Sequence, residues 1–524
     1  MAQPALADFP PDLVAGWLLV FLPAPDLVAA SRSCRTLAGL PQQPELWHRL
    51  AQAALGAASC ALHEAAAATP PPADAHGAAA WWRGLVRAAA DCRTLRWGPY
   101  EAAQRLEATE QAQLLLVSCA HVAVAVGEVV LLIGGMAGPN SQPASGVVVV
   151  DCRALEVRPA ALAEGSEKPP ALLRHAACGI APAEPGGPPR VLVLGGVTDR
   201  SYQPPLLHGT SMALVLEVLD AGARRVRWHW QPLEGEAPAG GAALFHHVLC
   251  SFDGGRRAVA WGGDCLDFHT REALKAVTAE CGTRAESAFV LDVRSWRWQR
   301  VQTGGERPGH RSLAQAVVHD GRLVVLGGSS EPKPPRPFAC GELADMAPYA
   351  LDLRSWQWAA APAQPGAAMP VPRTRFTVER RGAWLVGYGG RGEGQDALGD
   401  VFALNLETLE FGSPDIEGDE NAECLASFAS SLCGGLVLGG YASGMHWPRA
   451  DPLLLAHAGD GGGGEGSESS EAEEGEDTLE GDGAGAGERS GSEAEERAPD
   501  EREGGSAGGE RGGAQDAGEA DAGA

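Results

Sequence analysis

The sequence predicts a mainly β protein: a closed ring of six small antiparallel sheets, the β-propeller architecture, between a short helical segment and an acidic tail. Three observations predict this. Six apolar runs end in Gly pairs at similar spacing, apolar residues before position 56 recur with helical periodicity, and almost no aliphatic residue follows position 457. The expected parts are a helical motif over 5–56, an Ala/Pro-rich linker over 57–93, the propeller over 94–457, and a disordered Gly/Glu/Ser tail over 458–524.

The Gly pairs define the repeat. Their first members are 61, 67, 65, 62 and 50 residues apart, a period that fits one four-stranded sheet per repeat. We expect a glycine where a strand ends in a sharp turn against a neighbouring backbone, because glycine has no Cβ. The pairs are Gly134-Gly135, Gly195-Gly196, Gly262-Gly263, Gly327-Gly328, Gly389-Gly390 and Gly439-Gly440.

Each repeat reads as an inner strand, a buried strand that ends in the Gly pair, a strand of the type LDL, and an outer strand that begins at a Trp. We assign Trp228, Trp296 and Trp356 to this outer position, where a large rigid ring can pack one sheet on the next. The alternative of an irregular β-sandwich does not account for six pairs in register with the other elements.

Closure of the ring can also be predicted. The last repeat lacks an outer strand, and residues 94–100, TLRWGPY, precede the first inner strand. We expect this segment to supply the missing strand, with Trp97 in the outer position, because closure removes the free sheet edge.

These units resemble kelch repeats, and residues 294–328 contain a nearly complete junction between two of them. The resemblance implies a six-bladed kelch propeller and a role in binding proteins. Arg271, Arg284, His310, Arg311 and Arg391 lie in or beside loops between strands, where recognition residues usually lie, and are our candidate partner contacts.

The N-terminal segment has a separate pattern. Pro10-Pro11-Asp12 can start a helix whose apolar face includes Leu13 and Leu22, and Pro23 and Pro25 end it. Asp26 can cap a second helix, and Glu45-Leu46-Trp47 starts a third. From the residues alone, this is a three-helix bundle of unknown role or a helical cap on the propeller.

The same segment resembles an F-box, with mild departures at Phe9, Gly16 and Leu37. The resemblance implies docking on a Skp1-type adaptor and, through it, a cullin, so that the propeller would present a bound protein for ubiquitination. The alternative is a kelch scaffold unconnected with ubiquitination. The residues implied in adaptor binding are Phe9, Pro10, Leu13, Leu18, Leu22, Pro23, Leu27, Leu46 and Trp47.

The distribution of charge and the cysteine content indicate which partners and which cellular compartment to expect. Residues 458–524 hold 21 Asp and Glu against four Arg, so −17 of the net charge of −26 lies in the tail, and no nucleic-acid partner is expected. The twelve cysteines are scattered, which predicts reduced thiols in a protein of the cytoplasm or nucleus. The apolar run Leu13–Leu22 is about half as long as a membrane span, so we expect a soluble protein without a membrane partner.

We expect no enzyme. None of the phosphate-binding, dinucleotide-binding, zinc-protease or serine-hydrolase motifs occurs in the sequence, so no catalytic residue, cofactor or metal is predicted. The cluster around Asp264, Asp267, His269 and Cys281 fits no standard zinc spacing and is interpreted as a solvated loop. A copper oxidase of the kelch type would need more than the five Tyr present and a secreted setting.

Overall fold

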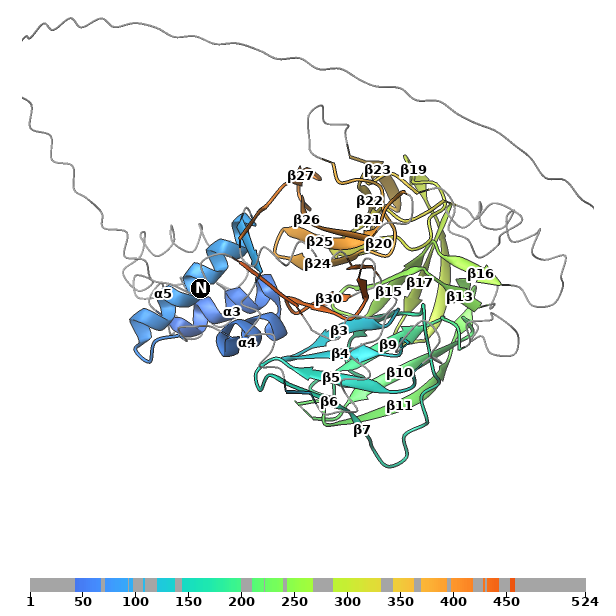
Figure 1. Cartoon of the computed structure of the whole chain (residues 1–524). Coiled ribbons are helices and arrows are strands. Elements are labelled where there is room, and N and C mark those ends of the chain that lie inside the picture. Colours follow the sequence, from blue (N-terminus) through green and yellow to red (C-terminus); the bar gives the residue numbers. More distant parts are fainter. Residues whose placement is uncertain are drawn as a thin grey trace, which may run out of the picture. The chain divides into compact units, whose positions relative to one another are not determined.

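A computed structural model describes most of the chain from residue 43 to residue 457 (Figure 1). The F-box residues from Phe9 to Leu27, the candidate contacts Arg271 and Arg284, and the acidic tail 458–524 lie outside the described residues. The described ranges are 43–66, 71–92, 94–97, 107–108, 120–136, 144–198, 210–220, 222–238, 243–266, 286–330, 343–361, 369–393, 397–417, 427–428, 431–442 and 453–457.

Three helices form the N-terminal part: α3 (Pro44–Leu55), α4 (Ala57–Ala66) and α5 (Ala75–Asp91). Pro44 begins α3 and Gly56, at φ +89°, ends it, as expected for residues that start and stop helices. The linker expected over 57–93 is therefore wrong for most of its length. Its Ala-rich sequence has high helix propensity, and the prolines at 70–72 interrupt it only between α4 and α5.

Within the ranges just given, the propeller consists of six sheets, of which five have five strands and one has four. Sheet 1 contains β2 (Glu107–Ala108), β3 (Val122–Val126), β4 (Val129–Ile133), β5 (Val147–Asp151) and β6 (Glu156–Pro159). Sheet 2 contains β7 (Ala161–Leu162), β8 (Ala176–Ile180), β9 (Arg190–Leu194), β10 (Met212–Val218) and β11 (Arg225–Pro232). Sheet 3 contains β12 (Glu234–Gly235), β14 (Val248–Phe252), β15 (Arg257–Trp261), β17 (Ser287–Asp292) and β18 (Arg297–Gln302).

The second half of the chain forms the remaining three sheets. Sheet 4 contains β19 (Gly304–Gly305), β20 (Gln315–His319), β21 (Arg322–Leu326), β22 (Tyr349–Asp352) and β23 (Gln357–Ala360). Sheet 5 contains β24 (Thr377–Arg381), β25 (Trp384–Arg391), β26 (Ala397–Asn405) and β27 (Phe411–Gly412). Sheet 6 contains β28 (Asp415–Glu417), β30 (Ser431–Cys433), β31 (Leu436–Leu438), β33 (Leu453–His457) and, from the start of the chain, β1 (Thr94–Trp97).

Two short ribbons complete the strands. They pair β13 (Ala243–Phe245) with β16 (Asp264–Leu266), and β29 (Ser427–Phe428) with β32 (Tyr441–Ala442).

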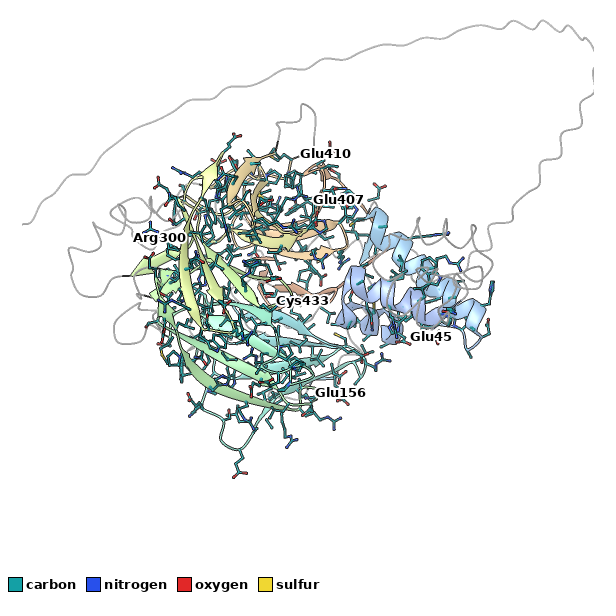
Figure 2. The ribbon with its side chains drawn as sticks, turned by 180° about the vertical axis from the view of Figure 1, so that it is seen from behind. Glu45, Glu156, Arg300, Glu407, Glu410 and Cys433 are labelled. Carbon is teal, nitrogen blue, oxygen red and sulfur yellow. The ribbon has the colours of Figure 1, made fainter. Side chains whose placement is uncertain are left out.

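The six sheets surround one channel. Their inner strands are in contact in the cyclic order β3, β8, β14, β20, β24, β30 and back to β3. A separate apolar cluster fills each interface between neighbouring sheets, so the core of the protein is a ring of six small cores. The exposed side chains of Glu156, Arg300 and Glu410 lie toward the outer strands (Figure 2).

The predicted closing strand is β1. It pairs antiparallel with β33 through Leu95 and His457, and takes the fourth position from the channel in sheet 6. Leu95 is fully buried in the core between sheets 5 and 6. Trp97 ends the strand, and its side chain lies outside the described part. Leu95 packs between the sheets and corresponds in register to Trp298 and Trp358.

The assignment of two of the packing tryptophans needs correction. Trp228 is 1% exposed and packs in the core between sheets 1 and 2 as expected. Trp296 and Trp356 instead lie half-buried in the turns before the outer strands, at φ +54° and +59°. The buried rings are those of Trp298 and Trp358, two residues further along the chain.

The glycine pairs have a shared backbone role. In the first four pairs, the second glycine donates its N–H to a carbonyl of the following sheet, for example from Gly135 to Leu172 and from Gly196 to Leu244. Both glycines of every pair have positive φ. A Cβ on Gly195 would lie 2.1 Å from the Leu244 carbonyl oxygen, so this contact between sheets excludes a side chain.

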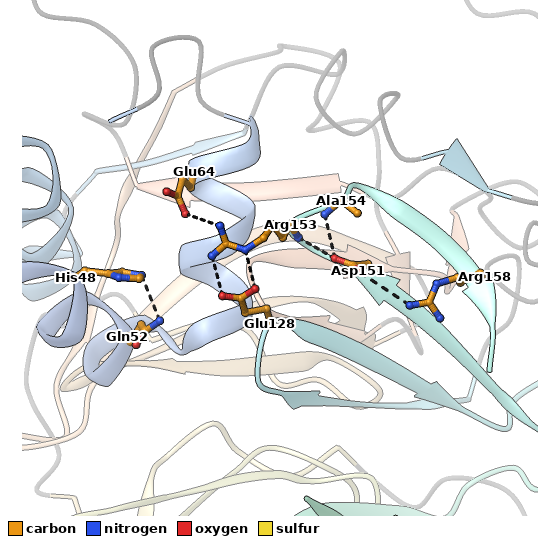
Figure 3. A network of polar contacts seen from close by, with 8 residues as sticks. All are labelled: His48, Gln52, Glu64, Glu128, Asp151, Arg153, Ala154 and Arg158. Atoms are coloured by element: carbon orange, nitrogen blue, oxygen red, sulfur yellow. Dashed lines mark hydrogen bonds and ion pairs between the residues drawn. The ribbon is translucent and has the colours of Figure 1, made fainter. Parts of the chain in front are cut away.

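The helices α3 and α4 pack directly against the propeller. Ala58, Ala61 and Leu62 of α4 belong to the apolar cluster between sheets 6 and 1. Around them, Arg153 bonds to Glu64 of α4 and to Glu128 in the turn between β3 and β4 (Figure 3). Gly382, in the turn between β24 and β25, donates its N–H to the Ala54 carbonyl at 2.7 Å. The helices therefore cover the end of the channel where the inner strands of sheets 1, 5 and 6 finish.

Within the described ranges, every helix is too short or too polar to pass through a lipid bilayer.

Candidate functional site at the channel mouth

The other end of the channel, where the inner strands begin, has an unusual backbone. In five sheets, the residue two positions before the inner strand has φ between +55° and +60°. Residues with a Cβ rarely adopt this left-handed conformation, because it is sterically strained for side chains such as those of arginine, leucine and histidine. These five residues, which we call the channel mouth, are Ala120, Arg174, His246, Leu313 and Arg375.

Hydrogen bonds between backbones connect the mouth around the channel. The N–H of Arg174 donates to the Ala120 carbonyl at 3.4 Å, that of His246 to the Arg174 carbonyl at 3.2 Å, and that of Leu313 to the His246 carbonyl at 3.0 Å. Each bond crosses from one sheet to the next. These bonds link the mouth residues of sheets 1 to 4 and fix the relative positions of their backbones.

The mouth has cationic character. The positive charges of Arg174 in sheet 2 and Arg375 in sheet 5 both lower the pKa of His246. The two arginines therefore lie near the same histidine but come from different sheets. Burial, opposed in part by a hydrogen bond from Nδ1 to Asp264 at 3.1 Å, lowers the pKa of His246 to about 4. At neutral pH the imidazole is uncharged, and a ligand meets two guanidinium groups and one carboxylate.

Two buried arginines, Arg311 and Arg373, lie beside the mouth and cross-link the chain there; we call these residues and their bonding partners the rim. Arg311 donates to the carbonyls of Gly327 and Asp345 and to the Asp345 carboxylate at 2.8 Å. Arg373 makes the corresponding bonds in sheet 5, to the Gly389 carbonyl and the Asp400 carboxylate. Each guanidinium therefore ties the end of a buried strand to a residue that lies beyond the next loop.

The predicted contact residues are placed differently. His310 and Arg311 are 8% and 4% exposed, and His310 Nε2 bonds to the Gly263 carbonyl at 2.8 Å. Both side chains support the scaffold and offer no surface to a partner. Arg391 is half-buried at the end of β25, where its backbone pairs with Thr374.

The two described residues of the F-box pattern are also buried. Leu46 and Trp47 of α3 are each 2% exposed and pack in the cluster between α3 and α5. In this conformation they stabilise the helical part and are not available to an adaptor.

Sequence analysis missed Arg174, His246 and Arg375 as site residues. Their signal was present, because each stands two positions before an apolar inner strand, as an alignment of the repeats by their inner strands would show. The left-handed backbone that gives this position its role is visible only in the structure.

The described residues offer little for covalent or metal chemistry. No three His, Cys, Asp or Glu residues among them gather closely enough to hold a metal ion, while Asp267, His269 and Cys281 lie outside the described part. Burial raises the pKa of the Cys250 thiol to about 12, which removes its nucleophilic form at neutral pH.

Comparison with known proteins agrees with the repeat. Residues 190–440, just under half of the chain, match the family described as the KLHDC2/KLHL20/DRC7 kelch-repeats domain. A stretch of 104 residues is 32% identical to dynein regulatory complex subunit 7 of Chlamydomonas reinhardtii. That stretch covers 20% of this chain but only 8% of the relative. The chain thus contains a kelch-repeat domain, and the family match begins at residue 190, well after the helical segment.

Proposed function

We propose that the six sheets are the blades of a kelch propeller that binds a partner protein at the channel mouth, and that the chain acts as a non-catalytic interaction scaffold. The observation that carries this is the ring of left-handed residues. The chain keeps bulky and charged residues in a strained conformation around one opening, and such strain is concentrated at binding sites.

The rim supports the same function. A binding surface gains affinity when its groups are held in place before the partner arrives, because less conformational entropy is lost on association. The backbone bonds of the mouth and the buried guanidinium groups of Arg311 and Arg373 provide this order. The helices contact the propeller at the opposite end of the channel, as at Gly382.

Proximity labelling with the full chain tests the proposal. Proteins labelled by the wild-type chain are compared with those labelled by the double variant Arg174→Ala/Arg375→Ala. We expect partners to be lost, because two charged anchors of the mouth are removed. A matched control, Arg256→Ala, removes an exposed arginine from the turn between β14 and β15. If the mouth variant labels the same partners as the wild type, the mouth is not the binding site.

The F-box pattern before residue 48 supports a more specific role, that of a substrate receptor in a cullin–RING ubiquitin ligase. The helices that follow this pattern contact sheets 1, 5 and 6, so an adaptor bound to the N-terminal segment would be joined to the propeller through packed contacts. Such a receptor works by proximity, because it raises the effective concentration of the target near the conjugating enzyme.

Co-purification with a Skp1-type adaptor tests this role. We expect wild-type protein to capture the adaptor and Leu22→Asp to abolish capture. Trp47→Ala is unsuitable for this test, since its ring lies in the core between α3 and α5 and its loss would disturb folding. If wild-type protein captures no adaptor while partners at the mouth are retained, the chain is a scaffold unconnected with ubiquitination.

A further inference from the structure

Three buried histidines line up directly behind the mouth. His121, His175 and His247 each follow a mouth residue and begin the inner side of sheets 1, 2 and 3, where they are 6%, 6% and 7% exposed. They pack against the glycine pairs: a Cβ on Gly134 would lie 3.0 Å from Cε1 of His175, and one on Gly195 would lie 3.1 Å from Cε1 of His247. We call these three residues the histidine row.

The fold itself does not require histidine at this position. In sheet 5 the same place holds Phe376, which packs against Gly327 and Gly390 as His175 packs against Gly134 and Gly196. In sheet 4 it holds Ala314, 7% exposed. Neither ring nitrogen of His247 has a hydrogen-bond partner among the described residues. A buried polar group without a partner costs stability, so His247 is less favourable in sheet 3 than the phenylalanine that fits the same place in sheet 5.

The surroundings of the histidine row disfavour the protonated form of the imidazoles. Burial, with a smaller contribution from the neighbouring His121, lowers the pKa of His175 to about 3, and a backbone hydrogen bond with Ile133 opposes this shift in part. Burial also lowers the pKa of His247 to about 3, with smaller contributions from His175 and His246. The charged groups next to His246 at the mouth are Arg174, Arg375 and the carboxylate of Asp264. A proton on His247 would thus add positive charge beside His246, whose own surroundings already hold two arginines and one carboxylate.

We propose that the histidine row is an acid-sensitive latch, which opens the channel mouth when the imidazoles of sheets 1 to 3 take up protons. Each imidazole binds one proton from solvent as the sheets separate and returns it when they close, so the change is reversible. The inference concerns the stability of the mouth and holds whether or not a partner binds there.

The direction of the pH effect follows from the two states. Above the ordinary histidine pKa of about 6.5 the imidazoles are neutral in both states, and the closed mouth has its full stability. As the pH falls below 6.5, the open state binds protons that the closed state rejects. Opening is then favoured by up to about tenfold per pH unit for each histidine, until the pH approaches the low pKa of the closed state.

The pH dependence of urea unfolding of the full chain between pH 5 and pH 8 tests the proposal. We expect wild-type protein to lose stability below pH 6.5 with an uptake of at least two protons, and the double variant His175→Phe/His247→Phe to lose about two of these. The control His229→Phe changes a half-buried histidine of β11 outside the row and keeps the wild-type slope. Equal slopes for the wild type and the double variant would overturn the latch.

A second measurement does not depend on whether the variants fold. Calorimetric unfolding of wild-type protein at pH 5.5, in two buffers with different ionisation enthalpies, gives the number of protons bound on unfolding. Amide exchange, corrected for the intrinsic effect of pH, then shows where opening begins. We expect β8 and β14 to lose protection before β20 and β24. Uptake of less than one proton, or equal loss of protection in all four strands, contradicts the proposal.

Discussion

Arg373 binds the carboxylate of Asp400 with two hydrogen bonds, from Nη1 to Oδ1 at 2.6 Å and from Nη2 to Oδ2 at 2.7 Å. The arginine side chain is fully buried, whereas that of Asp400 is 49% exposed. Nη1 also donates to the Gly389 carbonyl. A surface carboxylate therefore neutralises a guanidinium group inside the rim of the channel mouth.

This asymmetry predicts different costs for the two partners. Asp400→Ala leaves a buried cation without its counterion, and we expect a loss of about 2 kcal/mol after allowance for the exposure of Asp400. Arg373→Leu should cost less, because sheets 2 and 3 carry Leu172 and Leu244 at the corresponding position. Urea unfolding of both variants measures the difference, and a larger loss for Arg373→Leu would contradict this account.

Closure of the ring predicts a role for Leu95 well beyond its own strand. Leu95→Ala should destabilise the propeller by about 3 kcal/mol, since the side chain is fully buried between sheets 5 and 6. Ile416→Ala, on the neighbouring strand β28 and 37% exposed, should cost well under 1 kcal/mol. Thermal unfolding followed by circular dichroism compares the two. Similar melting temperatures would mean that β1 does not close the ring.

The glycine pairs predict a steric effect distinct from backbone strain. Gly195→Ala combines φ +67° with a Cβ 2.1 Å from the Leu244 carbonyl oxygen, and we expect it to prevent folding or to cost more than about 3 kcal/mol. Gly254→Ala has nearly the same φ, +64°, but open space around the Cβ, and should cost about 1 kcal/mol. Expression and unfolding of both variants separate the clash from the strain. Equal losses would show that strain alone selects glycine.

The contact between the helices and the propeller predicts that apolar packing outweighs the ion pairs. Leu62→Ala removes a side chain that is 2% exposed from the cluster between α4 and sheets 6 and 1, and should cost about 3 kcal/mol. Arg153→Ala removes the bonds to Glu64 and Glu128, but half of its side chain is exposed, so a loss of at most about 1 kcal/mol is expected.

The pH dependence of that ion pair has a defined sign. The hydrogen bond from Arg153 lowers the pKa of Glu128 below its ordinary value near 4.5. Its contribution is therefore present above pH 4.5 and is lost as the pH falls through the lowered pKa. In 1 M salt, which screens exposed charges, we expect Arg153→Ala to have almost no effect and Leu62→Ala to keep its full effect. A salt-independent effect of Arg153→Ala would mean that its stem, and not its charge, stabilises the contact.

The repeated sheets could be predicted because their signals are local. Both glycines of all six pairs have positive φ, and at Gly134, Gly195, Gly262 and Gly327 a carbonyl oxygen also leaves no room for a Cβ. The closing strand could be predicted because the last repeat lacked an outer strand and the segment before the first contained one. The tryptophan register was off by two residues in sheets 3 and 4, since each doublet offers two tryptophans and the sequence does not show which of them lies in the turn.

The sequence by itself determined the number of repeats, the order of strands within each and the segment that joins the two ends of the ring. These depend on the conformational limits of single residues and on apolar periodicity, which are properties of short segments. Only the tertiary structure decided that Arg311 lies inside the scaffold, that Arg174, His246 and Arg375 meet at the mouth, and that α4 fills the interface between sheets 6 and 1. These outcomes depend on contacts between residues far apart in the chain, which exist only once the ring has closed.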